Sequence, residues 1–197
     1  LGWNKGDEQE IFTMEELIEF FTIERVNKAG AVFDIKKLNW INSHYLKEVE
    51  LHELMEMLKP YIQDAGYDIP EQEKFEYMIS SVRDGLEYLS QIGEKIEIFY
   101  KDSFTVEEDE AKEMLTLDSS KEVFTQLITE IEGLDNITPE NFKAALKAVQ
   151  KATKIKGKLL FMPTRIAISG QMHGPELNYF AAVLGKEKVI DLLKKQI

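Results

Sequence analysis

Apolar residues recur every three or four positions along most of this chain, a spacing that places them on one face of an α-helix. The first such face follows Thr13, which together with Glu16 forms the capping-box pattern of a helix start. Asp34 is suited to cap a second helix, and Thr138 followed by Pro139 predicts another start. Alternating apolar and polar runs, which are typical of strands, are scarce. The sequence therefore predicts an all-α fold.

Proline and cap residues predict where the helices begin and end. Pro60 is expected to kink or stop the third helix, and Pro70 is expected to begin a fourth that runs to about Gly93. Thr105 begins a second capping-box pattern and predicts a short helix that ends near Thr116. The positions that we expect to be buried are Leu17, Phe21, Leu38, Leu46, Leu54, Leu127, Leu146 and Val149.

The apolar spacing lapses at residues 63–70 and 102–105, and we place the seams of the chain there. The first seam divides the chain into residues 1–66 and 67–197. The second divides the longer part into two subdomains near residues 102–105. No repeat of fixed period and no low-complexity segment interrupts these parts.

The composition is that of a globular protein: 44% of the 197 residues are hydrophobic and 30% are charged. The absence of cysteine excludes disulfides and cysteine-ligated zinc. No apolar run reaches the ~20 residues that a membrane-spanning helix needs, so we expect no transmembrane segment and no membrane partner. The absence of cysteine fits a reducing compartment such as the cytoplasm. The opening Leu1-Gly2-Trp3-Asn4 lacks both a Met and a signal pattern, and we therefore expect a fragment of a longer protein.

Charge is distributed unevenly along the chain, although the net charge is −12. Residues 1–139 carry 13 Lys and Arg against 32 Asp and Glu, whereas residues 140–197 carry 11 against 4. A localised basic region on an acidic body favours a nucleic-acid partner. A lysine-rich helix that only keeps the protein in solution would give the same pattern, so this interpretation needs a second feature.

Signatures of the common enzyme classes are missing from the sequence. It has no glycine-rich phosphate-binding motif and no nucleophile elbow, and its three histidines (His44, His52 and His173) form no metal-binding pair at helical spacing. The acidic run at residues 107–110 is typical of a solvated surface. We therefore expect no catalytic residue and no metal site in this chain.

Two groups of motifs resemble those of one enzyme family. The first group is Leu1-Gly2-Trp3-Asn4, Glu10-Ile11-Phe12-Thr13-Met14-Glu15-Glu16-Leu17, Ala31-Val32-Phe33-Asp34 and Leu38-Asn39-Trp40-Ile41-Asn42. The second is Phe161-Met162-Pro163-Thr164-Arg165, Gly174-Pro175-Glu176-Leu177 and Leu184-Gly185-Lys186-Glu187. In this order and separation, they are similar to the C-terminal part of bacterial glutamyl-tRNA synthetases, which are class I aminoacyl-tRNA synthetases.

The resemblance implies a helical stem-contact region at residues 1–66 and a multi-helix cage at residues 67–197 that binds the anticodon loop of tRNA(Glu). It also implies a monomeric, cytoplasmic parent enzyme that attaches glutamate to tRNA with ATP and magnesium. The family's ATP-binding domain and its adenylate-binding signatures are missing from this sequence. The resemblance therefore implies no cofactor and no catalysis in this chain alone.

The resemblance also assigns roles to individual residues. Arg165, Pro175 and Leu177 match anticodon-facing positions of the family, and Arg83 matches the arginine that reads the first anticodon base. An arginine suits this role because its five donors form a fixed fork that matches the edge of an unpaired base. Each arginine also has a simpler alternative: Arg165 would neutralise a nearby glutamate, and Arg83 would pair with Asp84.

The lysines near the C-terminus are expected to contact phosphates, which position an RNA without reading its sequence. They are Lys143, Lys147, Lys151, Lys154, Lys156 and Lys158. Their alternative role is to keep the protein in solution.

Two other functions stay open. One is a helical scaffold whose acidic body docks a basic protein, and the other is the equivalent domain of a class I lysyl-tRNA synthetase, although the Leu-Gly-Trp and Val-Phe-Asp motifs favour glutamate.

The aromatic residues Trp3, Phe33 and Trp40 lie beside apolar stripes, so we expect them to pack in the core rather than to stack on bases.

Overall fold

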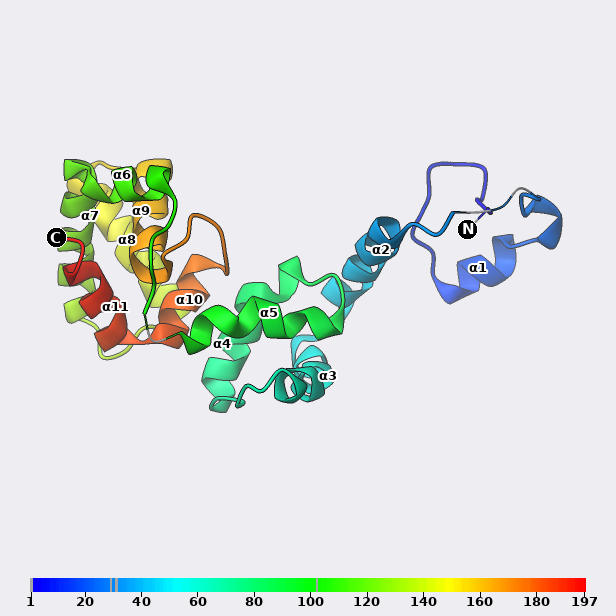
Figure 1. The fold of residues 1–197 in the computed structure, drawn as a ribbon, viewed down its shortest axis with the longest axis horizontal. Coiled ribbons are helices and arrows are strands. Elements are labelled where there is room, and N and C mark those ends of the chain that lie inside the picture. The colour runs from blue at the N-terminus through cyan, green and yellow to red at the C-terminus, as the bar shows by residue number, and fades with distance from the viewer. Residues whose placement is uncertain (1, 29, 31, 102) are drawn as a thin grey trace.

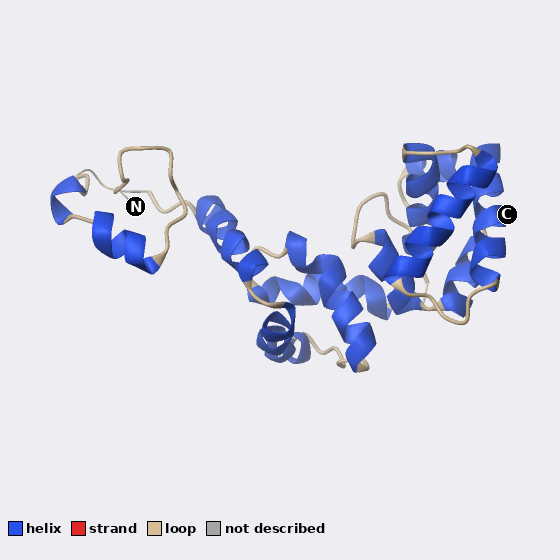
Figure 2. Ribbon diagram, turned by 180° about the vertical axis from the view of Figure 1, so that it is seen from behind, coloured by secondary structure: helices blue, strands red, loops and turns tan. Residues whose placement is uncertain are grey.

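The structure is a computed structural model that describes residues 2–28, 30, 32–101 and 103–197. Leu1 and Ala31 of the quoted motifs and Asp102 of the predicted seam lie outside the described residues. Within the described ranges the chain forms helices and no strand (Figure 2), so the predicted all-α fold is confirmed. The molecule is elongated, with the N-terminal segment at one end and a helical bundle containing the C-terminus at the other (Figure 1).

The described residues form α-helices joined by short turns and 3₁₀ helices. The α-helices are α1 (Met14–Phe20), α2 (Ile35–Glu48), α3 (Leu51–Asp64), α4 (Gln72–Val82), α5 (Ile92–Ile96), α6 (Asp109–Thr116), α7 (Asp118–Glu132), α8 (Pro139–Thr153), α9 (Lys158–Ser169), α10 (Leu177–Leu184) and α11 (Lys186–Lys194). The 3₁₀ helices are η1 (Ile23–Arg25), η2 (Arg83–Gly85), η3 (Leu89–Gln91) and η4 (Glu97–Tyr100). Three predicted starts are confirmed, since Thr13 and Thr138 form capping boxes and Asp34 accepts from the Lys37 backbone N–H.

The helices build two hydrophobic cores. One lies among α6 to α11 and is centred on large, fully buried side chains such as Phe124 and Phe142. The other is formed by the end of α2 with α3, α4 and α5, so it spans the seam predicted at residues 63–70. Phe99 packs against both cores, and α10 packs against α4. The two cores are therefore in direct contact. The predicted buried positions that the structure confirms are Leu46, Leu54, Leu127, Leu146 and Val149.

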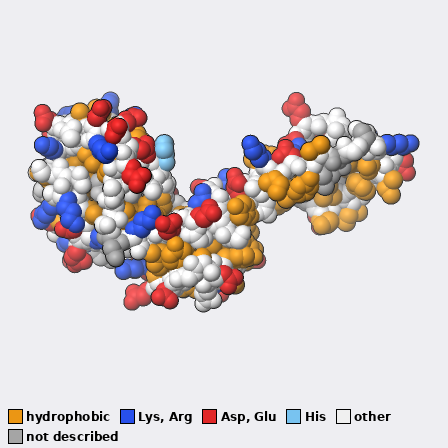
Figure 3. All heavy atoms as spheres, viewed as in Figure 1, with side chains coloured by type: hydrophobic (Ala, Val, Ile, Leu, Met, Phe, Trp, Pro, Cys, Tyr) orange, Lys and Arg blue, Asp and Glu red, His pale blue; other side chains and the backbone are white. Residues whose placement is uncertain are grey.

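The N-terminal segment has no comparable core. None of the described residues among the first 45 belongs to either core, and the predicted burial of Phe21 and Leu38 is wrong, since they expose 49% and 47% of their surface. Leu17 is only partly buried. Phe33 and Trp40 are also exposed, which corrects their assignment to the core. The reason is that the apolar stripe of a helix needs an opposing layer. Here many apolar side chains face outward instead (Figure 3).

Trp3 is the exception among the predicted core aromatics of this segment. It is partly buried, and its ring lies 5.7 Å from those of both Phe12 and Phe21, measured between centroids. This small aromatic cluster places Trp3 against the residues that flank the two ends of α1.

Several helix ends differ from the predicted ones. α3 does not stop at Pro60 but continues to its end at Asp64, because a proline this close to the C-terminus costs only one backbone hydrogen bond before the helix ends. α4 begins after Pro70 and ends well before Gly93. After the end of α4 the chain turns through η2, and this turn lets Leu86 and Ile92, both fully buried, reach the core.

Thr105 does not cap a helix. The next helix, α6, begins at Asp109, and its N-cap residue, Glu108, makes no side-chain capping bond. The backbone of Thr105 instead packs against Gly170, at the start of the turn that follows α9.

Candidate nucleic-acid interface

Arg165 lies on α9 and closes the turn that joins α9 to α10. Its Nη1 donates a hydrogen bond of 2.6 Å to the carbonyl oxygen of Pro175. Burial lowers the pKa of the Arg165 guanidinium below its ordinary value, and the Glu176 carboxylate opposes this shift. The guanidinium stays charged at neutral pH because arginine is the most basic of the side chains. The side chain therefore presents a partly buried cation beside the 170–176 turn.

Pro175 and Leu177 anchor this turn. Both side chains are buried, with 6% of Leu177 exposed. The backbone N–H of Glu176, between them, donates to the carbonyl oxygen of Ser81 at 3.0 Å. This bond ties the turn to α4 across the contact between the two cores. A contact from these two residues to a base would therefore come from the backbone of the turn.

The start of the turn requires glycine. Gly170 has a φ of +72°, in the left-handed region. A Cβ at this position would lie 2.9 Å from the carbonyl oxygen of Thr105 and 3.1 Å from Cβ of Phe104. The backbone of residues 104–105 thus packs directly against the turn and fixes its position.

Arg83 has a different environment from Arg165. Its Nη2 donates to the carbonyl oxygens of Lys47 and Val49, each at 3.0 Å, at the C-terminal end of α2. Neighbouring Ser81, Val82 and Asp84 line a cavity, but Arg83 does not. Reading of the first anticodon base by Arg83 stays a prediction, and the donors for it would be those other than Nη2. No ion pair joins Arg83 to Asp84 among the described residues, contrary to the simpler alternative.

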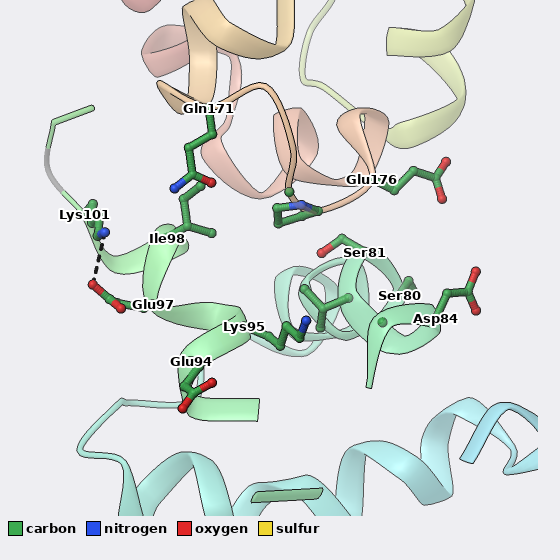
Figure 4. Close-up of a pocket in the computed structure, with 14 residues that line it drawn as sticks. Ser80, Ser81, Asp84, Glu94, Lys95, Glu97, Ile98, Lys101, Gln171 and Glu176 are labelled. Carbon is green, nitrogen blue, oxygen red and sulfur yellow. Dashed lines mark ion pairs between the residues drawn. The ribbon is translucent and has the colours of Figure 1, made fainter. Parts of the chain in front are cut away.

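A cavity of about 590 Å³ lies between the two cores. Its walls are the end of α4 with η2, the helices α5 and η4, and the 170–176 turn (Figure 4). The side chains that line it include Ser81, Lys95, Lys101 and Gln171. Lys101 pairs with Glu97 at 3.0 Å. No pattern along the sequence predicts this cavity, because its lining residues come from three separate segments.

The predicted phosphate-binding lysines are all exposed. Lys143, Lys147 and Lys151 are spaced by four residues on the side of α8 opposite its buried face. Lys158 pairs with Glu110 at 3.0 Å, and Lys154 has a left-handed φ of +63° just after α8. In the view of Figure 3, basic and acidic side chains are mixed over the bundle. Lys156, between Lys154 and Lys158, is also exposed.

The described parts of the chain contain no group of three or more His, Asp or Glu side chains that could hold a metal ion. In those same parts, no helix combines the length and the apolar character needed to cross a membrane.

Comparison with known proteins places this arrangement in a family. The family "Anticodon binding domain" matches residues 53–197. The chain belongs to this family, whose match includes α9, the 170–176 turn and the cavity.

Curated relatives extend the similarity to the whole chain. It is 46% identical over 200 residues to glutamate–tRNA ligase 1 of Caldicellulosiruptor saccharolyticus, covering 98% of this chain and 41% of the relative. It is 40% identical over 199 residues to glutamate–tRNA ligase of Bacillus subtilis, covering 98% of this chain and 41% of that relative. The chain thus spans about two fifths of the length of these relatives.

Solved structures show the same fold. Glutamate–tRNA synthetase from Elizabethkingia anophelis matches with a TM-score of 0.78 and 25% identity, over 100% of this chain and 38% of that protein. A glutamate tRNA ligase from Elizabethkingia meningosepticum matches with a TM-score of 0.77 at 24% identity, covering 100% of this chain and 38% of that one.

Proposed function

We propose that this chain is the tRNA-binding, C-terminal part of a glutamate–tRNA ligase and that it recognises the anticodon loop of tRNA(Glu). The family match over residues 53–197 carries the proposal, and the names of the relatives support glutamate over lysine as the amino acid. The proposed division is stem contact by residues 1–66 and anticodon binding by residues 67–197. The parent enzyme is proposed to be a monomeric, cytoplasmic ligase that joins glutamate to tRNA.

Recognition of the anticodon is assigned to Arg165 and the 170–176 turn. The bases of an RNA loop are unstacked, so their edges are open to hydrogen bonds from side chains and backbone. Arg165 uses Nη1 to hold the carbonyl oxygen of Pro175, which leaves its remaining donors for a base. Pro175 and Leu177, buried under the turn, hold its backbone in place for the same purpose.

Binding of the RNA backbone is assigned to the exposed lysines. Lys143, Lys147 and Lys151 form a row on one side of α8, and Lys154, Lys156 and Lys158 continue beyond it. Such contacts supply affinity that falls with salt but carry no sequence information. Lys158 would have to exchange its pairing with Glu110 for a phosphate, so we expect it to contribute less than the lysines of α8.

The ATP and magnesium that the resemblance implies for the parent enzyme do not fit this chain, whose sequence has no glycine-rich phosphate-binding motif. The described residues offer no cluster of metal ligands. We therefore assign both groups to the part of the relatives that this chain does not cover, and derive no step of the ligation here.

A binding titration tests the proposed function. The chain is titrated with tRNA(Glu) and with a tRNA of unrelated anticodon at several salt concentrations. We expect tighter binding of tRNA(Glu) and a linear fall of log affinity with log salt concentration. Equal affinity for both tRNAs, or no binding of either, would contradict the proposal and favour a scaffold for a basic protein.

A further inference from the structure

Lys95 extends from α5 into the cavity between the two cores (Figure 4). The side chain is partly buried. Its ammonium nitrogen lies 3.7 Å from the place where a Cβ on Gly85 would stand, so it reaches across the cavity to η2.

No hydrogen bond or ion pair engages the Lys95 ammonium among the described residues. The other cavity lysine, Lys101, is paired with Glu97 at 3.0 Å. An ammonium carries three N–H donors and no acceptor, and in Lys95 none of them is engaged by another described group. Lys95 is therefore placed to donate to a ligand that enters the cavity.

The charges around the cavity indicate what kind of ligand would suit it. Its lining carries the carboxylates of Asp84, Glu94, Glu97 and Glu176 against the ammonium groups of Lys95 and Lys101. A net negative lining disfavours a phosphate. A neutral nucleobase fits better, because its edge combines a ring or carbonyl acceptor for an ammonium with N–H donors for carboxylates and carbonyls.

The position of the cavity connects it to the proposed RNA site. The 170–176 turn, which Arg165 closes, forms one of its walls through Gln171, Gly174 and Pro175. A loop bound at this turn would bring an adjacent unpaired base to the cavity. Its volume of about 590 Å³ lies within the range of pockets for small ligands.

From these observations we infer that Lys95 is a specificity-determining residue, which donates a hydrogen bond to an acceptor on the edge of one unpaired anticodon-loop base held in this cavity. The inference rests on the proposed function, because it takes the anticodon loop as the ligand. It goes further by naming the residue, the cavity and the kind of contact.

The test uses the full chain and RNA hairpins that carry the anticodon loop of tRNA(Glu), with binding measured by fluorescence anisotropy. One hairpin has the natural loop, and each of the others has an abasic site at one anticodon position. Lys95→Met removes the ammonium but keeps most of the apolar stem. Lys101→Met is the matched control, since it makes the same charge change in the same cavity at an ammonium that is already paired.

We expect Lys95→Met to weaken binding of the natural hairpin about tenfold. On the abasic hairpin that lacks the base contacted by Lys95, the same substitution should cause almost no further loss of affinity. Lys101→Met should cause a smaller loss that is the same for every hairpin. Thermal unfolding of each variant checks the fold, and Lys95→Gln, which retains an uncharged donor, should restore part of the affinity.

Two results would overturn the inference while leaving the proposed function intact. In one, the wild-type chain binds the natural hairpin and Lys95→Met binds it equally well. In the other, both Met variants lose the same affinity on all hairpins, so that Lys95 acts only as a charge. If the wild-type chain binds none of the hairpins, the proposed function itself fails.

Discussion

Replacing Arg83 tests whether this residue supports the fold or reads a base. Its Nη2 donates to two carbonyl oxygens, those of Lys47 and Val49, each at 3.0 Å. A hydrogen bond from a charged group contributes about 1.5–3 kcal/mol when well buried, but Arg83 is partly exposed, so about 1 kcal/mol for each bond is appropriate. A cation at the C-terminal end of α2 adds about 0.3–1 kcal/mol through the helix dipole. We therefore expect Arg83→Ala to lower the free energy of unfolding by about 2–3 kcal/mol.

Urea denaturation followed by tryptophan fluorescence measures this loss. The chain has two tryptophans, Trp3 and Trp40, and Trp40 lies on α2 itself. With a denaturant slope of about 2 kcal/mol/M, the midpoint should fall by about 1–1.5 M. Arg83→Lys is the control. Its ammonium keeps the charge at the end of α2 but cannot reproduce the geometry of the guanidinium, so this variant should lose about half of the unfolding free energy that Arg83→Ala loses.

The reasoning is refuted if Arg83→Ala leaves the urea midpoint unchanged. If the same variant instead reduces the discrimination between hairpins with different anticodons, Arg83 is a base-reading residue, as the sequence resemblance implies, and its bonds to α2 are incidental.

Further predictions concern the cores, the turn, the pH dependence and catalysis. Leu127→Ala should cost about 2–5 kcal/mol in urea denaturation, because Leu127 is fully buried, whereas Leu38→Ala, at an exposed site, should change the stability by less than about 0.5 kcal/mol. Gly170→Ala should lower the melting temperature through about 1–3 kcal/mol of backbone strain plus the clash with residues 104–105, and an unchanged melting temperature would contradict the packing of the turn. Burial and Glu73 raise the pKa of Tyr77 to about 12. As the pH rises, the tyrosine therefore loses its proton in the unfolded chain before it does so in the folded chain, and the free energy of unfolding should fall between about pH 10 and 12. Thermal unfolding over this pH range should show a smaller fall for Tyr77→Phe. The chain alone should show no glutamate-dependent ATP–pyrophosphate exchange, and exchange above background in a pure sample would place catalytic residues in this segment.

The helices of the C-terminal two thirds could be predicted from sequence because their apolar stripes meet other helices of the same chain. Leu127 and Leu146 are buried as their spacing predicts. The stripe of α1 did not predict burial: no residue of α1 is buried, and Phe21 stays 49% exposed although the Trp3 ring lies beside it. Periodicity identifies an apolar face but cannot say whether its partner belongs to the same stretch of sequence.

The site was predictable only where the motif is local. Arg165 and Pro175 are ten residues apart on one helix and the turn that follows it, and the structure brings them into hydrogen-bond contact. The cavity at Lys95 is built from three segments that are far apart in the sequence, so the spacing of residues along the chain does not predict it. Arg83 shows the complementary limit, because a residue type suited to base reading is equally suited to bind the carbonyl end of a helix.

The central claim, that α9 and the 170–176 turn read the anticodon, is tested most directly by comparing Arg165→Ala with Lys147→Ala. Lys147 is exposed within α8, where alanine adds no strain, and the affinities are measured for tRNA(Glu) and for a tRNA of unrelated anticodon. Lys147→Ala should weaken both tRNAs alike, because a phosphate contact carries no sequence information. Arg165→Ala should cost about 1–3 kcal/mol on tRNA(Glu) and reduce the difference between the two tRNAs. Equal, uniform losses for the two variants would contradict the claim.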